Sequence, residues 1–179
     1  MRVLIIGDTH IPRRASSLPK EISEFIRSKL FDLIICTGDL TDRKVLEYFE
    51  TLAEKIVVVK GNMDHLNLPE YVELSIGEIK VGIIHGHQVY PRGNRKKLAD
   101  IGKEKGVDVL VSGHTHSPDM YMGDVLLLNP GSATGVWGGG GGSMRPSFMV
   151  LTVEGKRIDV KLYEFDKVLS MRSETFYLK

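Results

Sequence analysis

Six short apolar runs, rich in β-branched residues, recur along the chain, and each of them ends in glycine. They cover residues 3–7, 33–38, 56–61, 81–86, 109–113 and 125–131. Continuous apolar runs of this length, closed by a turn residue, are typical of strands that are buried on both faces. The pattern therefore predicts six buried strands.

Three amphipathic segments predict helices, over residues 18–30, 41–53 and 94–105. Thr41 or Asp42 can cap the second helix. The lysines of the third helix predict a solvated face, and steering of phosphate is the alternative. The helical period places the following apolar residues inward: Ile22, Phe25, Ile26, Leu30, Val45, Leu46, Phe49, Leu52, Leu98 and Ile101.

The order of these elements changes along the chain. The first half alternates strand and helix, which predicts parallel strands joined by right-handed crossovers. From about residue 119 strands dominate, with one hairpin predicted around Gly123 and Asp124 and a second that turns at Glu154 and Gly155. The expected fold class is α/β, with two packed sheets and helices outside them.

A single domain is expected to cover residues 1–179, because a chain of this length can bury one core. Five consecutive glycines in the segment 136–146 predict a flexible loop. This loop is either a mobile lid near a site or a tolerated surface insertion, and the sequence leaves both alternatives open.

Composition narrows the class of protein. Hydrophobic residues make up 42% and charged residues 26%, which fits a folded globular chain. The formal net charge of +1 gives no indication of nucleic-acid binding. The N-terminal apolar run is too short for a signal peptide, and no run is long enough to span a membrane. The single cysteine, Cys36, fits a reducing compartment, so we expect a cytoplasmic protein.

All histidines of the chain lie at or just after the end of one of the apolar runs. They are His10, His65, His85, His87, His114 and His116. In open α/β sheets, ligands bind outside the carboxyl ends of the strands, so these side chains can converge in space.

Carboxylates and an amide join the histidines. Asp8 precedes His10 by two positions, and Asp39 and Asn62 follow the glycines that close the second and third runs. In extended backbone, residues i and i+2 point to the same side, so each D-x-H or H-x-H pair can present two ligand atoms together. Imidazole and carboxylate ligands suit divalent Mn, Fe, Ni or Zn, and the absence of thiolates argues against a structural zinc site. We expect an open, catalytic metal site.

Each motif alone is weak, since a D-x-H or H-x-H pair can be ordinary loop polarity. Their order carries the specificity, because D-x-H, GD, GN, H and GHxH each close an apolar run. In this order they resemble the motifs of the calcineurin-like metallophosphoesterases, D-x-H, GD, GNH[DE], H and GHxH. Here they read GDTH, TGDL, GNMD, HGH and GHTH, between residues 7 and 116.

The resemblance implies a four-layer αββα sandwich of two mixed sheets, with two divalent metal ions at the strand ends. Manganese is the first expectation, and nickel, iron or zinc are alternatives. It implies that the first metal is held by Asp8, His10 and His116, the second by Asn62, His85 and His114, and both by Asp39.

More narrowly, the chain resembles the small single-domain branch of that family. This branch contains compact phosphodiesterases and also the retromer subunit of this fold. The strings GDTHIPRRASSLP, HGHQVYPRG, SGHTH and LNPGSATG carry this similarity, which runs nearly end to end.

The expected activity is that of a divalent-metal-dependent phosphoesterase, above all a phosphodiesterase. Two bound ions lower the pKa of a bridging water, and the resulting hydroxide is the nucleophile. Two dications against Asp8 and Asp39 leave positive charge that draws in a phosphoester substrate.

Two other functions stay open. The alternative from a different class is a scaffold of retromer-subunit type, with a protein partner or a second copy on an apolar surface. A third possibility is a nucleotide- or nucleic-acid-processing enzyme to which a partner presents the substrate.

One position departs from the family pattern. Met63 stands where many members have a histidine after the asparagine, and a thioether cannot donate a proton. His65 and His87 are the candidates for an acid or a substrate-positioning group, and each can instead be a loop histidine without a role. Asp64 is expected to orient the loop or a ligating histidine, not to bind metal.

Overall fold

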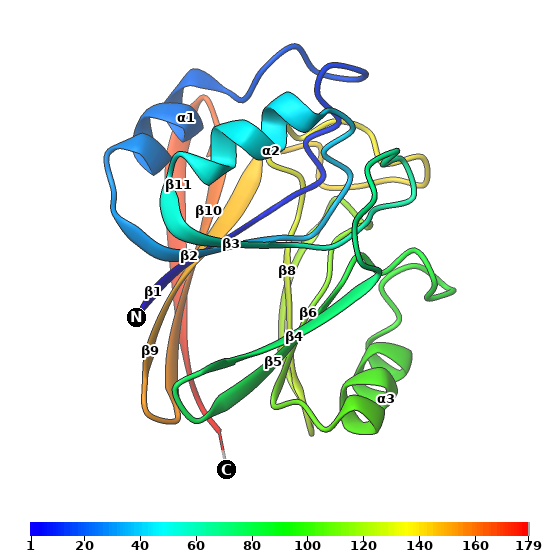
Figure 1. Ribbon diagram of the computed structural model, residues 1–179, viewed down its shortest axis with the longest axis vertical. Coiled ribbons are helices and arrows are strands. Elements are labelled where there is room, and N and C mark those ends of the chain that lie inside the picture. The colour runs from blue at the N-terminus through cyan, green and yellow to red at the C-terminus, as the bar shows by residue number, and fades with distance from the viewer. Residues whose placement is uncertain (179) are drawn as a thin grey trace.

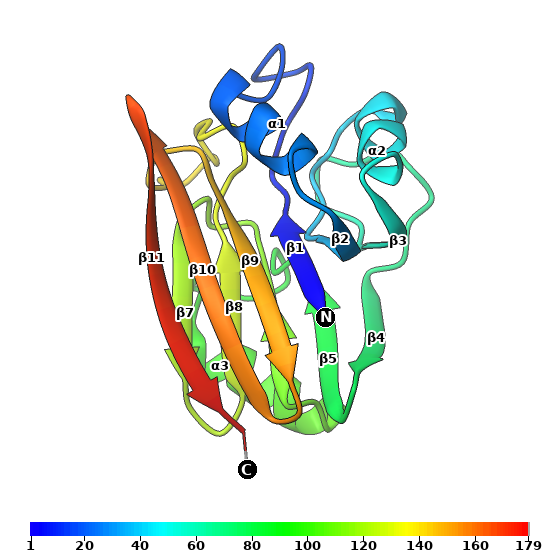
Figure 2. The same cartoon turned by 90° about the vertical axis from the view of Figure 1, so that its left-hand side faces the viewer.

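The computed structural model describes residues 1–178, which form two mixed β-sheets packed face to face with helices on their outer sides (Figure 1). The first sheet has the order β11-β10-β9-β1-β2-β3 and the second the order β4-β5-β6-β8-β7. Figure 2 shows the first sheet in front of the second. The predicted fold class is confirmed.

The strands of the first sheet are β1 (Arg2–Ile6), β2 (Phe31–Cys36), β3 (Ala53–Val58), β9 (Ser147–Glu154), β10 (Arg157–Asp166) and β11 (Val168–Tyr177). Those of the second are β4 (Tyr71–Ile76), β5 (Ile79–Ile84), β6 (Val109–Val111), β7 (Pro118–Met122) and β8 (Leu126–Pro130). The helices are α1 (Lys20–Arg27), α2 (Arg43–Glu50) and α3 (Arg95–Lys105).

The strands that position the candidate ligands run parallel. In the first sheet β1 pairs in parallel with β2, and β2 with β3. In the second sheet β5 pairs in parallel with β6, and β6 with β8. The loops after β1, β2 and β3 therefore leave one edge of the first sheet together, and those after β5 and β6 leave one edge of the second.

Strand β1 is apolar from Val3 to Ile6 because it is buried on both faces. Val3 and Ile5 belong to the core between the two sheets. Leu4 and Ile6 belong to the core between the first sheet and the helices α1 and α2. Since successive side chains of a strand point to opposite faces, a strand buried on both sides needs apolar residues throughout.

The predicted helices exist but two of them are shorter. Helix α1 ends at Arg27, where Ser28 caps it. Leu30 was predicted to lie inward, and this is wrong: its side chain is 89% exposed. The helical period no longer applies beyond the cap, so the side chain takes another direction. Helix α2 is capped by Asp42, whose side chain accepts a hydrogen bond from the Lys44 N–H.

The two predicted hairpins are present as the antiparallel pairs β7 with β8 and β9 with β10. Strands β4 and β11 were not predicted. Both are edge strands, and β11 is largely exposed, so its sequence lacks the apolar run of a buried strand. Pairing with β10 along its whole length fixes it. Within residues 1–178, no helix combines the length and apolar character that crossing a bilayer requires.

Candidate metal centre

Loops from both sheets bring buried histidines and carboxylates together in two overlapping groups. The ligand atoms within each group lie within 4.8 Å of one another. The first group is Asp8, His10 and His116, and the second is Asp8, Asp39 and His85. All of these side chains are at most 2% exposed. Either group can hold a metal ion.

In the first group, His116 is the central residue. Its Nε2 atom lies 3.3 Å from Asp8 Oδ1 and 3.1 Å from His10 Nε2. The residues come from the loops after β1 and β6, so two different sheets supply the ligands.

In the second group, Asp39 lies between two histidines. Its Oδ2 atom is 3.4 Å from His85 Nε2 and 3.4 Å from His10 Nε2. Asn62 Oδ1 lies 3.2 Å from the same His85 nitrogen. Asp39 thus connects the two groups, which is the place that a bridging ligand would occupy.

The hydrogen bonds of the histidines show that these residues fit a metal. His116 Nδ1 donates to the Val136 carbonyl at 2.6 Å, and His85 Nδ1 donates to the Thr37 carbonyl at 2.7 Å. A carbonyl only accepts, so each Nε2 is left to face the carboxylates with its lone pair. Asp8 Oδ1 is buried without a hydrogen-bond partner. A cation between these converging acceptors would satisfy them, and backbone carbonyls behind the histidines are typical of metal sites.

The pKa shifts agree with a centre that needs positive charge. Burial disfavours the charged form of His85, but the hydrogen bond to Asp39 and the charges of Asp8 and Asp39 outweigh it and raise the pKa of His85 to about 9. Burial also opposes the charged form of Asp39, yet the contacts with His85 lower the pKa of Asp39 to about 2. Without a metal, a proton on His85 supplies the charge that a divalent ion would supply.

The backbone is strained at the candidate ligands. Left-handed φ values are found at Asp8 (48°), His10 (48°), Asp39 (51°), His114 (67°) and His116 (55°). Non-glycine residues rarely adopt this region, and such strain gathers at functional sites. The D-x-H and H-x-H pairs do come together, but by left-handed turns. The expectation that they do so through extended backbone was wrong.

Asn62 and His114 lie at the margin of the two groups. Asn62 is exposed, and its contact is with His85. The His114 ring lies 5.1 Å from that of His85, and its backbone N–H donates to Asp8 Oδ2 at 2.9 Å. Burial and the charges of His85 and Arg92 lower the pKa of His114 to about 4, which leaves this imidazole neutral and able to bind a metal.

Asp64 connects two loops of the centre through hydrogen bonds to their backbone. This buried carboxylate accepts hydrogen bonds from the backbone N–H groups of Asp39 at 2.8 Å, Thr41 at 2.8 Å and Gly61 at 2.9 Å. Both oxygens are therefore occupied by the backbone of the loops after β2 and β3. These contacts suit an orienting residue.

The two candidate acids differ in position. The His87 ring is exposed and lies 5.5 Å from the His85 ring and 6.2 Å from that of His114. Partial desolvation and the nearby His85 lower the pKa of His87, which favours its neutral form. His65 is exposed and makes no hydrogen bond, ion pair or ring contact with another residue in the range 1–178.

Gly61 must be glycine because the backbone of another loop lies against it. A Cβ at this position would overlap Asp39 at both its backbone nitrogen and its Oδ1 atom. We expect Gly61→Ala to lower the free energy of unfolding by about 1 to 3 kcal/mol and to weaken metal binding, because it displaces Asp39. Thermal unfolding and metal titration measure the two effects.

The control for that substitution is Gly123→Ala, at an exposed turn whose nearest contact is the Tyr121 ring. This control is expected to change neither quantity. Equal behaviour of the two variants would contradict the steric argument.

Ser132 Oγ supports the centre by donating to the Asp8 carbonyl at 2.7 Å. Sequence reasoning missed two other supporting groups, the Val136 carbonyl, which orients His116, and the side chain of Arg92. Arg92 donates to the carbonyls of His114 and Gly138. No sequence signal marks a backbone carbonyl, whereas Arg92 stands in the same loop as His85 and could have been considered.

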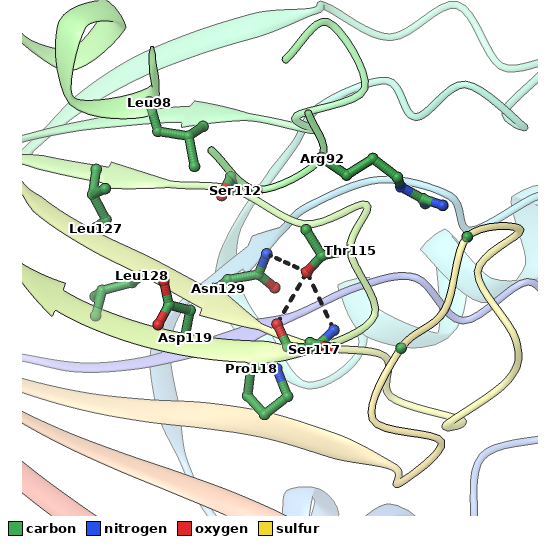
Figure 3. Close-up of a pocket in the computed structure, with 13 residues that line it drawn as sticks. Arg92, Leu98, Ser112, Thr115, Ser117, Pro118, Asp119, Leu127, Leu128 and Asn129 are labelled. Carbon is green, nitrogen blue, oxygen red and sulfur yellow. Dashed lines mark hydrogen bonds between the residues drawn. The ribbon is translucent and has the colours of Figure 1, made fainter. Parts of the chain in front are cut away.

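Arg92 also lines a cavity of about 390 Å³ behind the segment that carries His114 and His116. Figure 3 shows that its guanidinium points away from Leu98 and Leu127 and toward the Gly-rich loop. The segment 136–146 thus lies against the candidate centre, as the lid alternative requires, while its flexibility stays a prediction.

The chain belongs to the calcineurin-like phosphoesterases. The sequence model described as the Calcineurin-like phosphoesterase superfamily domain matches residues 1–156, which includes every loop of the candidate centre. This confirms the family that the order of the motifs indicated.

Individual relatives agree with the family. A probable metallophosphoesterase of Methanocaldococcus jannaschii is 54% identical over 135 residues, which are 75% of this chain and 69% of the relative. Vacuolar protein sorting 29 of Cryptosporidium parvum has a TM-score of 0.94 at 30% identity, with 98% of this chain and 97% of that chain covered. Wild-type Vps29 of Entamoeba histolytica complexed with Zn²⁺ has a TM-score of 0.91 at 34% identity, with 98% and 99% covered.

Proposed function

We propose that this protein is a divalent-metal-dependent phosphodiesterase with two metal ions in its centre. The observation that carries the proposal is the convergence of buried acceptor atoms from Asp8, His10, Asp39, His85 and His116 in two overlapping groups. Asp39 Oδ2, equidistant from His10 and His85, suits a ligand shared by both ions.

In this proposal, side chains of the protein bind the metal ions and fix their positions. Asp8, His10 and His116 would hold one ion, and Asn62, His85 and His114 the other, with Asp39 between them. Bound ions supply a nucleophile from water at neutral pH and positive charge for the phosphate oxygens.

The protein groups behind the ligands prepare the site before the substrate arrives. The carbonyls of Val136 and Thr37 fix the ring orientation of His116 and His85. Asp64 holds the loops of Asp39 and Asn62. A site whose ligands are already oriented needs little reorganisation during the reaction, which is the main source of electrostatic catalysis.

Manganese is the first metal to test, since imidazole and carboxylate ligands suit it, and zinc is the second. Zinc has support from the Vps29 structure of Entamoeba histolytica that contains this ion. The ligand set alone also fits nickel and iron.

The experiment is hydrolysis of bis-p-nitrophenyl phosphate by the protein after removal of metal and reloading with Mn²⁺ or Zn²⁺. We expect turnover with metal and none with chelator. A loaded protein that hydrolyses neither this diester nor p-nitrophenyl phosphate would contradict the enzyme proposal.

Met63 leads to a prediction about leaving groups. Its backbone N–H donates to Asp39 Oδ1 at 2.7 Å, so this position lies beside the centre. Met63→His adds a proton donor there, and we expect turnover of alkyl phosphodiesters to rise by about ten- to a hundredfold. Turnover of p-nitrophenyl esters should change little, because this leaving group needs no proton. Steady-state kinetics on both substrates measure the difference, and an equal change on both would contradict it.

A second candidate function is a protein-binding module of the Vps29 type. The observation that favours it is the coverage of 98% of this chain at a TM-score of 0.94 by the Cryptosporidium parvum protein. Metal content after purification and the behaviour of an Asp39→Asn variant distinguish the two functions. Loss of hydrolysis supports the enzyme, and loss of partner capture alone supports the scaffold.

A further inference from the structure

Three consecutive carbonyls of the Gly-rich segment each accept a hydrogen bond from a side chain of another segment. The Val136 carbonyl accepts from His116 Nδ1 at 2.6 Å. The Trp137 carbonyl accepts from Arg14 at 2.8 Å, and the Gly138 carbonyl from Arg92 at 2.9 Å. We call residues 136–143 the strap.

The strap packs directly on His116. A Cβ on Gly138 would lie 2.8 Å from the ring of His116, and a Cβ on Gly142 would lie 2.9 Å from its Cβ. Ser143 N–H closes the other end by donating to the His116 carbonyl at 2.9 Å. Gly138 and Gly142 thus allow the backbone to approach both the ring and the Cβ atom of the histidine, which explains why these two positions are glycine.

The two arginines held by the strap carry charge that no carboxylate balances. Within residues 1–178, neither Arg14 nor Arg92 forms an ion pair. Arg92 Nε is buried without a hydrogen-bond partner, and Arg14 is exposed next to the Trp137 ring, 5.9 Å away. The exposed arginines Arg95 and Arg145, by contrast, each face an aspartate.

Arg14 and Arg92 also lie close to the candidate ligands. The backbone N–H of Arg14 donates to the His10 carbonyl at 2.8 Å, and the Arg92 guanidinium donates to the His114 carbonyl at 2.5 Å. The three adjacent carbonyls of the strap therefore bind His116 and the two guanidinium groups in sequence, and each guanidinium has N–H groups beyond the one that the strap binds. Arginine at such a place binds phosphate or carboxylate oxygens through its planar fork.

We propose that Arg14 and Arg92 bind a second anionic group of the substrate, outside the metal centre. This inference rests on the proposed phosphodiesterase function and narrows its substrate class. The substrate is a phosphodiester that carries a further phosphoryl group, and the strap fixes the two arginines for it. The alternative is that both arginines only hold the strap in place.

The test compares ligands that differ by one phosphoryl group. Thymidine monophosphate and thymidine bisphosphate are titrated calorimetrically into the manganese-loaded protein. We expect the bisphosphate to bind about tenfold more tightly, as a charge-assisted contact predicts. Arg14→Gln and Arg92→Gln should each reduce this ratio to about twofold or less, and Arg92→Lys should retain part of it.

Arg13→Gln is the matched control, because Arg13 is also exposed and makes no hydrogen bond or ion pair with another residue in the described part of the chain. The ratio of the affinities of Arg13→Gln for the bisphosphate and the monophosphate should equal that of the wild type. If Arg14→Gln and Arg92→Gln weaken both nucleotides equally, the arginines only hold the strap and the proposal is overturned. A wild-type ratio near one overturns it as well.

Kinetics separate this inference from the proposed function. The p-nitrophenyl ester of thymidine monophosphate is compared with the same ester carrying a second phosphoryl group on its free sugar hydroxyl. We expect the second ester to have the lower KM at similar kcat. Absence of hydrolysis of both esters would contradict the phosphodiesterase proposal, while the calorimetric ratio still decides the role of the arginines.

Discussion

Asp39→Asn is expected to lower kcat/KM for bis-p-nitrophenyl phosphate by about a thousandfold or more, because in the proposed centre Asp39 is the ligand that both metal ions would share. Asp39 is 2% exposed, and its Oδ2 atom lies between His10 and His85. The substitution keeps the shape of the side chain and removes one negative charge. Metal analysis of the purified variant should show reduced content.

The fold should survive this substitution. The amide oxygen can still accept the Met63 N–H, and the new NH₂ group can donate to a histidine nitrogen that now needs no cation opposite it. Circular dichroism checks that point. Asp100→Asn, on the exposed face of α3, is the control and should keep full activity. Activity of Asp39→Asn within about tenfold of the wild type would show that Asp39 is not a shared metal ligand.

The buried part of the fold could be predicted from the sequence. Strands such as β1 and β2 are apolar on both faces, and that requirement is local and visible. Strand β11 was missed because most of its side chains are exposed, and its position depends on pairing with β10. Leu30 was misplaced because the end of α1 depends on a cap that the apolar period does not show.

The candidate site was predictable for a related reason. Side chains with metal-binding chemistry directly follow buried strands, so their type and order can be read along the chain. The groups that orient them could not be predicted, because they come from distant segments. Val136 is 20 positions from His116, and Trp137 is 123 positions from Arg14. The left-handed backbone conformation at Asp8 and His10 could not be predicted either, because contacts with the rest of the fold maintain it.

Asp64→Ala is expected to have the largest effect on stability, about 3 to 5 kcal/mol in the free energy of unfolding. The carboxylate is 4% exposed and accepts from three backbone N–H groups, those of Asp39, Thr41 and Gly61. Alanine leaves these buried donors without a partner. Chemical denaturation of the metal-free protein measures the loss without any contribution from bound ions.

Asp32→Ala provides the matched control, because this exposed carboxylate accepts from one backbone N–H, that of Arg2. Water can replace it, so the expected loss is about 1 kcal/mol or less. For Asp64→Asn we expect a loss of stability between those of Asp64→Ala and Asp32→Ala. The amide oxygen still accepts a hydrogen bond, but the NH₂ group faces a backbone N–H and cannot accept from it. A direct metal ligand would behave differently: its removal would leave the metal-free protein as stable as before and lower only metal affinity. If Asp64→Ala gave that result, Asp64 would be a metal ligand and not a residue that orients the loops.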